Sequence, residues 1–437
     1  MKSLSIKFIL AALLIAQIAQ SASAMTLLEA IQVSLNNNPK LVANENRIEA
    51  AEDRLQATRL DWVPDVRVGA NYNFNQNDQN PASQSRNVGV STSLNLYDGG
   101  ARAQNLIAEE SQLEATKDRN NTTNPFTRNT RASVAGSVLD TYVNVLNIIE
   151  SKKYANFSES TLKIFLKAAV TDTEAAIIKQ QLEVLKTQNT RLDFRLAQAQ
   201  KDFKRYTTVD LPPLESLQTL DEAIRSLGIP KNETSAIEIA LVKNPDIKVA
   251  SKDLITAKAR YESQKASYGP QVSVNVSASN GGSRRSGEDF NSSTTATVGF
   301  NVSMQFDVSR KYSLSASQKS IEAAENDQNA EIDDTRYKIE NVYSKLQNQT
   351  EIYKAQVQAL SVAQERLQLV LNKIKNGQVV EIKDEALFSL QVYNEYSSAT
   401  LVGRTDMLYS RFAIQQAVGT LFDNLNKNAN MSESFAK

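Results

Sequence analysis

The sequence repeats itself, and this repeat restricts the possible folds more than any other feature. A shift of 206 residues aligns Asn38-Pro39 with Asn244-Pro245 and Pro64 with Pro270 without a gap. At the same shift the following pairs are also identical: Ile31/Ile237, Leu35/Leu241, Ala51/Ala257, Arg54/Arg260, Val66/Val272 and Val68/Val274. Chance rarely gives so many identities at one spacing. We therefore infer a tandem duplication, with copies near residues 26–210 and 234–424.

Each copy begins with the signals of two helices. Thr26 with Glu29, and Ser235 with Glu238, fit the capping box, in which a hydroxyl and a carboxylate each bind an unpaired backbone N–H at a helix start. The Asn-Pro pair of each copy then ends one helix and begins a longer one, because Asn caps helices and Pro fits the first helical position. The longer helix has to stop before the later proline.

After these later prolines, apolar residues recur at every second position, which is typical of β-strands with one apolar face. In the first copy they are Val66, Val68, Ala70, Tyr72 and Phe74, then Val88, Val90, Leu94 and Leu96. In the second copy they are Val272, Val274, Val276 and Ala278, then Ala296, Val298, Phe300, Val302, Met304 and Phe306. We predict hairpins over 65–97 and 271–307 with strands of about ten residues. The polar segments 75–87 and 280–294 are predicted as exposed loops.

Strands with one apolar and one Asn/Ser/Thr face match the pattern of a transmembrane β-barrel. An open sheet edge would leave backbone groups unpaired in lipid, and four strands are too few to close a barrel, since the smallest use about eight. Several chains therefore have to share the barrel. The alternative is a soluble, half-buried hairpin packed on the helices. The residues assigned to the lipid-facing side are Val66, Val68, Tyr72, Val90, Leu94, Val274, Val298, Phe300 and Met304.

Long helices follow each hairpin. An apolar residue recurs every seven positions at Ile332, Ile339, Leu346, Tyr353, Leu360, Leu367 and Ile374, as in a coiled coil. This predicts a helix over 313–375, which spans roughly 90 Å at about 1.5 Å per residue. Gly377 ends this helix, and a second one returns over about 384–421. The first copy has counterparts over 131–168 and 174–206.

The N-terminus has the pattern of a secretory signal peptide. Lys2 and Lys7 precede an apolar run, and Ala22-Ser23-Ala24 provides the small residues that signal peptidase recognises. We predict a signal peptide over 1–24. A membrane-spanning helix needs about 20 apolar residues, and no later segment is expected to reach that length. The segment 211–233 is predicted as a linker between the copies, and 425–437 as a C-terminal tail.

The composition leaves little for enzyme chemistry. The chain has no cysteine and no histidine, which removes disulfides, thiolate and imidazole metal ligands, and the commonest general base. Lys+Arg equals Asp+Glu at 49 each, so the net charge gives no indication of a nucleic-acid partner. The sequence has no Gly-rich phosphate loop, metal-ligand spacing or nucleophile motif. We therefore expect no enzyme, no cofactor, no metal and no nucleic acid.

Several local motifs follow one another in a particular order along residues 26–424. They are Leu27-x-x-Ala30 before Asn37-Asn38-Pro39, the helix from Ala50-Ala51 to Pro64, the strand exit Leu96-Tyr97-Asp98-Gly99-Gly100, and Gly377. In these motifs and their order the chain resembles the TolC family of outer-membrane efflux and secretion channels. The resemblance implies long coiled-coil hairpins plus four β-strands per chain in a trimeric, twelve-stranded transmembrane β-barrel in outer-membrane lipid. It also implies a tunnel across the periplasm, a periplasmic adaptor (membrane fusion) protein and an inner-membrane ABC or proton-driven transporter.

The same resemblance places the closed entrance and the adaptor contact at the tips of the helical hairpins. The tip residues are Thr171, Asp172, Thr173 and Glu174 in the first copy and Asn376, Gly377, Gln378 and Val379 in the second. Gly377 is either a flexible gate residue or an ordinary helix C-cap. Family members often have a carboxylate six residues later, where this chain has Lys383. Asp384 or Glu385 would then form an acidic constriction, unless they simply lie on a solvated face.

The two copies also differ from each other. The first copy lacks the tip glycine and has about nine extra residues around 120–129, where Pro125 should kink or break the helix. We predict the exit duct of a tripartite export system that conducts its substrate passively, with type I protein secretion slightly favoured over drug efflux. The alternative is a periplasmic coiled-coil scaffold or adaptor without a membrane barrel.

Overall fold

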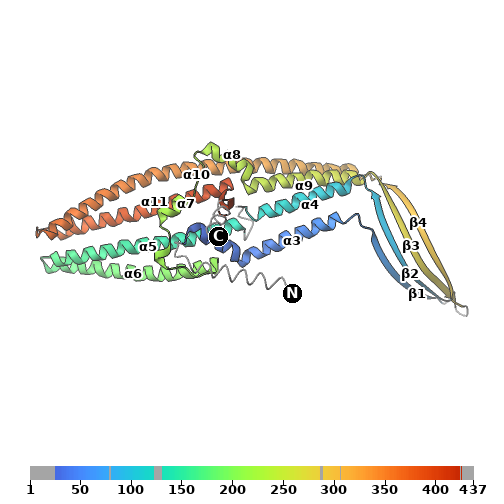
Figure 1. Ribbon diagram of the computed structural model, residues 1–437, viewed down its shortest axis with the longest axis horizontal. Helices are drawn as coiled ribbons and strands as arrows, with labels where there is room; N and C mark the ends of the chain where they lie inside the picture. Colours follow the sequence, from blue (N-terminus) through green and yellow to red (C-terminus); the bar gives the residue numbers. More distant parts are fainter. Residues whose placement is uncertain are drawn as a thin grey trace, which may run out of the picture. The chain divides into compact units, whose positions relative to one another are not determined.

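The computed structural model of the 437-residue chain describes residues 25–77, 80–122, 130–285, 289–305, 307–423 and 425. The predicted signal peptide, Pro125, Phe306 and nearly all of the predicted tail lie outside the described residues. The chain divides into two units (Figure 1). Of the described residues, those at 25–44, 120–245 and 333–425 form the helical unit, and those at 45–119 and 246–332 form the strand-bearing unit.

The strand-bearing unit contains one antiparallel sheet of four strands in the order β1-β2-β3-β4 (Figure 1). The strands are β1 (Asp65–Asn77), β2 (Asn80–Tyr97), β3 (Pro270–Arg285) and β4 (Asn291–Met304). They are longer than predicted, and most of the two expected loops is strand. Asn75 still pairs with Ser83, and Ser283 with Asn291, beyond the apolar residues. Polar side chains do not end a strand while its backbone N–H and C=O groups have partners.

The helices of this unit lie side by side in the same order as the strands. They are α3 (Pro39–Arg59), α4 (Ala101–Arg119), α9 (Pro245–Ser267) and the first part of α10 (Arg310–Lys375). As predicted, α3 and α9 begin at proline and end before the next one. Ion pairs connect the neighbours, as in Lys117–Glu52 at 2.8 Å between α4 and α3, and Lys258–Glu325 at 3.0 Å between α9 and α10. Arg119 of α4 binds both carboxylate oxygens of Asp253 of α9 at 2.7 Å.

Asp98 forms the turn from β2 into α4. Its carboxylate accepts hydrogen bonds from the backbone N–H of Gly100 and of Arg102, each at 3.0 Å, and from Nε of Arg102 at 2.9 Å. Gly99 and Gly100 have φ of +71° and +91°, which side chains disfavour. The Asp-Gly-Gly motif therefore ends the strand, turns the chain and caps the helix.

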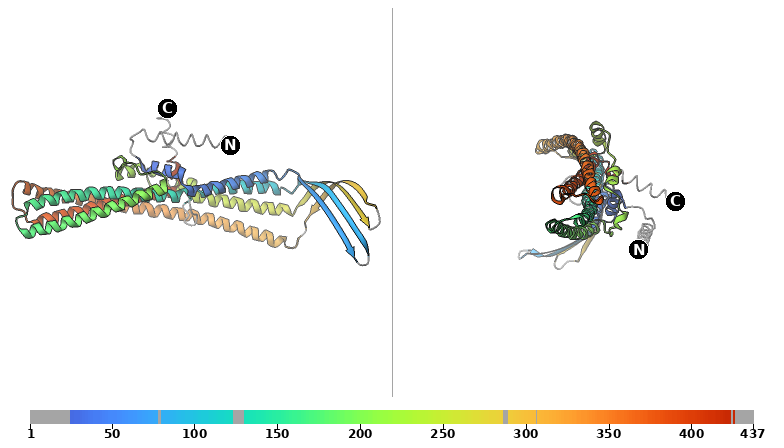
Figure 2. Two further views of the ribbon diagram at one scale, coloured as in Figure 1. Left: turned by 90° about the horizontal axis from the view of Figure 1, so that it is seen from below. Right: turned by 90° about the vertical axis from the view of Figure 1, so that its left-hand side faces the viewer.

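The helical unit contains two long antiparallel hairpins, as predicted (Figure 2). Its elements are α2 (Leu27–Asn37), α5 (Arg131–Ala168), α6 (Asp172–Thr207), η1 (Leu214–Ser216), α7 (Leu220–Ser226), α8 (Glu233–Lys243), the rest of α10, η2 (Ile382–Leu387) and α11 (Phe388–Val418). Helix α5 contacts both α6 and α11. Ser410 of α11 donates to Gln349 of α10 at 2.6 Å, which gives the helix order α6-α5-α11-α10. All residues of the predicted heptad row are buried or half-buried, and Ile339 and Leu367 are fully buried.

The largest core joins α2, α5, the end of α6 and α11 with the segment between the two copies. That segment was predicted as a linker, but it contains η1 and α7 and is packed. Leu217, Leu220 and Leu227 are buried in the core. The backbone N–H of Met25 also donates to the carbonyl of Ser216 at 2.7 Å, so this segment connects to the start of the first copy.

Equivalent side chains make the same hydrogen bonds in both copies. Asn38 and Asn244 donate their amides to a carbonyl in the last turn of α6 and of α11, at 3.2 and 2.7 Å. The hydroxyls of Tyr142 and Tyr343 donate to the carbonyls just before α2 and α8, at 2.6 and 2.9 Å. Burial raises the pKa of both tyrosines. The Asn-Pro pair therefore does more than cap a helix, because its amide also attaches the short helices to the long hairpin.

One of the two predicted capping boxes is wrong. Thr26 and Glu29 form the expected box, with hydrogen bonds of 3.2 and 2.8 Å. In the second copy, α8 already begins at Glu233, and the Asn232 side chain accepts from the backbone N–H of Ser235 at 2.8 Å. Asn232 is a strong capping residue three positions earlier, so the helix starts there instead.

The expectation that no later segment could span a membrane also needs correction. Among the described helices, α5 is long and apolar enough to do so by length and composition. Of its apolar stretch, 61% is buried inside the protein. Most of the buried apolar residues of α5 belong to hydrophobic cores of the helical unit, as expected for a core helix.

Replacing Gly99 by Ala should destabilise the strand exit more than replacing Gly100. Both have positive φ, so either Ala adds backbone strain of about 1–2 kcal/mol. A Cβ at Gly99 would also lie 2.7 Å from the carbonyl oxygen of Ala266, whereas a Cβ at Gly100 would meet no atom within 4 Å. Thermal unfolding followed by circular dichroism should therefore show a lower midpoint temperature for Gly99→Ala than for Gly100→Ala. Equal midpoints would contradict a close approach at Gly99.

Candidate functional site

The sheet separates apolar from polar residues onto its two faces. Its register forms rows across the strands, as in Val68–Val90–Ala278–Ala296. Phe300 and Val68 are 77% and 75% exposed, so the chain itself does not cover this face. The residues predicted to face lipid all lie on the apolar face: Val66, Val68 and Tyr72 of β1, Val90 and Leu94 of β2, Val274 of β3, and Val298, Phe300 and Met304 of β4.

The height of the apolar face is close to that of a barrel's hydrocarbon band. On β4 it extends over the eight residue steps from Ala296 to Met304. With about 3.4 Å per step and the tilt of about 40° that barrel strands have, this is a rise of about 21 Å, against a typical band of about 25 Å. Toward the hairpin turns, Asn280 and Thr294 hydrogen-bond to each other at 2.9 Å and begin the polar part of this face on β3 and β4.

The opposite face is polar, lined by small side chains and nearly uncharged. One row is Gly69–Gly89–Ser279–Thr295, and the next two rows toward the hairpin turns contain only Asn, Ser and Gly. At the helical end of β1, Asp65 and Arg67 pair with each other at 3.1 Å. A pore lined by these rows would present hydroxyl and amide groups to its contents.

The first predicted tip is the turn between α5 and α6, and it is fixed by a capping box. The Thr171 hydroxyl accepts from the N–H of Glu174 at 3.2 Å, and the Glu174 carboxylate accepts from the N–H of Thr171 and Val170 at 3.1 and 3.0 Å. The N–H groups of Thr171 and Val170, with a contribution from Ile382 of the second tip, hold the pKa of Glu174 below its ordinary value. The remaining tip residues, Asp172 and Thr173, are exposed.

The second predicted tip is a helix C-cap followed by an unpredicted π-turn. Gly377 has φ of +71°, its N–H donates to Ile374 at 3.1 Å, and the N–H of Gln378 donates to Lys373 at 3.0 Å. These bonds form a Schellman motif, which supports the C-cap interpretation of Gly377. The return helix begins with the π-helix η2, two residues before the predicted start. The other residues predicted here, Asn376, Gln378 and Val379, are exposed.

A shared apolar core joins the two tips. Phe165 of α5 and Ile178 of α6 are fully buried, together with Leu367 of α10 and Ile382 and Ala386 of η2. The π-turn has a role in this packing, since both of its buried residues point into the core. The structure therefore brings the two predicted tip segments together as one packed element.

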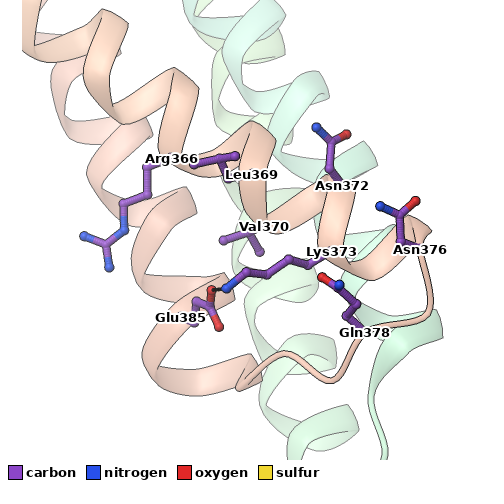
Figure 3. Close-up of a pocket in the computed structure, with 8 residues that line it drawn as sticks. All are labelled: Arg366, Leu369, Val370, Asn372, Lys373, Asn376, Gln378 and Glu385. Atoms are coloured by element: carbon purple, nitrogen blue, oxygen red, sulfur yellow. Dashed lines mark hydrogen bonds and ion pairs between the residues drawn. The ribbon is translucent and has the colours of Figure 1, made fainter.

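A groove of about 370 Å³ lies beside the second tip (Figure 3). It is lined by Arg366, Leu369, Val370, Asn372, Lys373, Asn376, Gln378 and Glu385. Lys373 and Glu385 point toward each other and form an ion pair at 2.6 Å. Of the two residues predicted for an acidic constriction, Glu385 is thus neutralised by a neighbour. Asp384 is exposed and has no ion pair among the described residues.

Sequence reasoning missed the polar contacts between the two hairpins. Ser158 of α5 donates to Asn394 of α11 at 2.7 Å. Arg404 of α11 has a side chain only 13% exposed, and it contacts the Tyr154 hydroxyl at 3.1 Å and the Asp221 carboxylate of α7 at 3.4 Å. One feature of the sequence could have indicated this contact: Arg404 lies between Leu401 and Leu408, which are both buried in the same helix.

The family follows from a match over most of the chain. Residues 30–209 and 236–382, about three quarters of the chain, match the model of the outer membrane efflux protein family. The chain belongs to this family. It is an outer-membrane protein, and the members of its family are efflux channels rather than enzymes. This membership weighs against a periplasmic scaffold without a membrane barrel. No curated protein sequence matches the chain.

Solved structures share the fold at low sequence identity. The chain is similar to CusC, with 17% identity, a TM-score of 0.69, and coverage of 90% of this chain and 92% of that one. It is similar to the outer membrane protein VceC from Vibrio cholerae, with 13% identity, a TM-score of 0.68, and coverage of 90% of this chain and 96% of that one. It is also similar to the MtrE outer membrane channel from Neisseria gonorrhoeae in its open state, with 16% identity, a TM-score of 0.68, and coverage of 91% of this chain and 89% of that one. These matches confirm the predicted TolC-like fold of long helical hairpins and a four-stranded sheet.

Replacing Thr171 by Ala should loosen the first turn of α6. The variant loses the hydroxyl that accepts from the Glu174 N–H, and loss of such a cap typically costs about 1 kcal/mol. Hydrogen–deuterium exchange of the amides at 172–175 should accelerate about fivefold. Thr173→Ala, at an exposed position outside the capping box, is the matched control and should exchange like the parent protein. If both variants exchange alike, the box does not stabilise the tip.

Proposed function

We propose that three copies of this chain form an outer-membrane exit duct with a twelve-stranded barrel. The observation that supports this best is the open sheet: β1 and β4 lack a second strand partner in the described chain, and the apolar face is uncovered. A sheet in hydrocarbon needs partners at both edges. Pairing β4 of one copy with β1 of the next would provide them. The number three comes from the family resemblance.

Exposed apolar residues on the long helices support the same closure. The helix order leaves α6 and α10 at the two edges of the helical unit. Phe194 on α6 is 73% exposed, and Val362 on α10 is 65% exposed. Contact between α6 of one copy and α10 of the next would bury these side chains. The helices would then close into a ring, as the strands would in the proposed barrel.

We place the partner contacts at the paired tips. Val170 and Val379 are apolar tip residues that are 82% and 92% exposed. The groove beside the Lys373–Glu385 pair offers both charges and apolar surface next to them. These features suit a periplasmic adaptor and, through it, an inner-membrane ABC or proton-driven transporter that supplies the energy. The duct itself conducts passively.

The polar face of the sheet favours a large polar cargo. Its uncharged rows of Gly, Ser, Thr and Asn leave space and offer no charge that would select cations. This supports type I secretion of proteins over efflux of small, often cationic drugs. The second candidate, drug efflux, is supported by the family description.

Arginine should be tolerated on one face of β4 and not on the other. Val298→Arg places a charge on the apolar face near the bilayer midplane, which costs about 2–4 kcal/mol. We expect loss of heat-modifiable oligomers from detergent extracts of the outer membrane. Asn301→Arg, on the polar face of the same strand, should assemble normally and change the single-channel conductance. Equal tolerance at both positions, or a soluble periplasmic monomer, would contradict the barrel.

Deleting the gene separates the two kinds of cargo. If the duct serves type I secretion, the deletion strain should lose one or more proteins from the culture medium while its drug susceptibility stays unchanged. Comparative proteomics of the medium and minimal inhibitory concentrations measure both. Increased drug susceptibility with an unchanged set of secreted proteins would establish drug efflux instead. Complementation with Asn301→Arg, which should assemble, and with Val298→Arg, which should not, provides matched controls.

A further inference from the structure

Two arginines lie on the apolar face of the sheet, closer to the hairpin turns than the last apolar residues of β2, β3 and β4, and in the rows of Tyr72 and Phe74 of β1. Asn280 and Thr294 form the first polar pair on this face toward the hairpin turns. Arg86 lies in the next row and Arg284 in the row after it. Both side chains are exposed. The apolar face therefore ends in a basic border at the end of the sheet that carries the hairpin turns.

An aromatic ring holds Arg86 in position. Its guanidinium carbon lies 4.5 Å from the centre of the Phe290 ring. Phe290 in turn lies against Gly282, the residue paired with Arg86, where an added Cβ would come within 2.6 Å of the ring. Because Gly282 has no side chain, the ring can lie on the sheet, and Arg86 stacks on it. Such stacking restricts the guanidinium before any ligand binds.

The second arginine is close enough to act with the first. Arg284 is a diagonal neighbour of Arg86 across β2 and β3, at a separation of about 7–8 Å. Among the described residues, neither guanidinium has a carboxylate partner. Arg67 on the opposite face is different, since it pairs with Asp65 at 3.1 Å. In the part of the chain that the structure describes, the two arginines thus present two neighbouring positive charges next to an apolar surface.

We propose that Arg86 and Arg284 bind the phosphate groups of phosphorylated lipids in the outer leaflet of the membrane. This rests on the proposed function, which turns the apolar face to lipid and the hairpin turns to the outside. Arg86 then lies one row beyond Val88, the last apolar residue of β2, and level with its pair Tyr72 of β1, at the height where hydrocarbon gives way to headgroups and aromatic residues gather in barrels. The planar fork of an arginine matches two oxygens of one phosphate, and a cation beside hydrocarbon selects an anion that is itself attached to acyl chains.

The test measures lipid retained by the purified, detergent-solubilised oligomer. The probes are bisphosphorylated lipid A and the same lipid without its phosphates, and native mass spectrometry counts the bound molecules. The parent protein should retain the phosphorylated lipid and show a higher temperature of dissociation into monomers on gels. The double variant Arg86→Gln, Arg284→Gln should retain about tenfold less of it. Arg67→Gln removes a charge from the opposite face and should behave like the parent protein.

The other outcomes overturn the proposal in distinguishable ways. Equal retention of both lipids, or full retention by the double variant, would show that the arginines do not recognise phosphate. Complete competition by millimolar inorganic phosphate would indicate a site for the free anion instead of a lipid. Arg86→Lys, Arg284→Lys keeps the charges without the forks and should give intermediate retention, provided that its oligomer forms. If the parent protein forms no membrane-embedded oligomer, the proposed function itself has failed.

Discussion

A β-strand in hydrocarbon has no water to pair its backbone, and this constraint explains the arrangement of the strand-bearing unit. The unit places β1 and β4 at the edges, each with one strand partner among the described residues, and leaves the apolar residues of one face uncovered. Such a sheet would be an aggregation hazard in water. In a membrane it is complete once copies join edge to edge. The helices α3, α4, α9 and α10 follow in the same order as the strands. Contact between neighbouring copies could therefore close a ring of strands and a ring of helices together.

Each copy has to change from strand to helix at the end of its second strand, and both use an aspartate for this. Asp98 accepts from the N–H two residues later in the first copy, and Asp307 accepts from the N–H of Ser309 at 2.8 Å in the second. The first copy adds two glycines with positive φ, and Gly99 also passes close to the backbone of Ala266 in α9. The common element is thus the carboxylate, which ends one structure and caps the next. The glycines answer the backbone conformation of the turn and, at Gly99 alone, close packing.

Periodicity predicted which residues share a face, because the pleat allows only two orientations and the apolar residues mark one of them. It failed on strand length, since the Asn, Ser and Gly rows near the turns are held by backbone pairing that side chains do not reveal. The capping-box pattern pointed to Ser235 as a cap, whereas Asn232, an equally good capping residue, begins the helix three positions earlier. The π-turn at Ile382 and the position of Arg404 depend on tertiary packing, for which a single sequence carries no periodic signal.

The tips of the two hairpins differ in their turns but share one core, and this affects how an entrance there could open. Separating them would expose side chains such as Phe165, Ile178 and Ile382, each worth about 1.5–3 kcal/mol when buried. Beyond the tip core, α5 and α11 are joined by hydrogen bonds such as Ser158–Asn394, each worth about 1 kcal/mol net and replaceable by water, and by apolar residues of the largest core such as Leu139 and Leu408. Separating the two hairpins would therefore expose apolar side chains at the tips and along the helices. Movement costs less if the paired tips move as one body and keep their shared core.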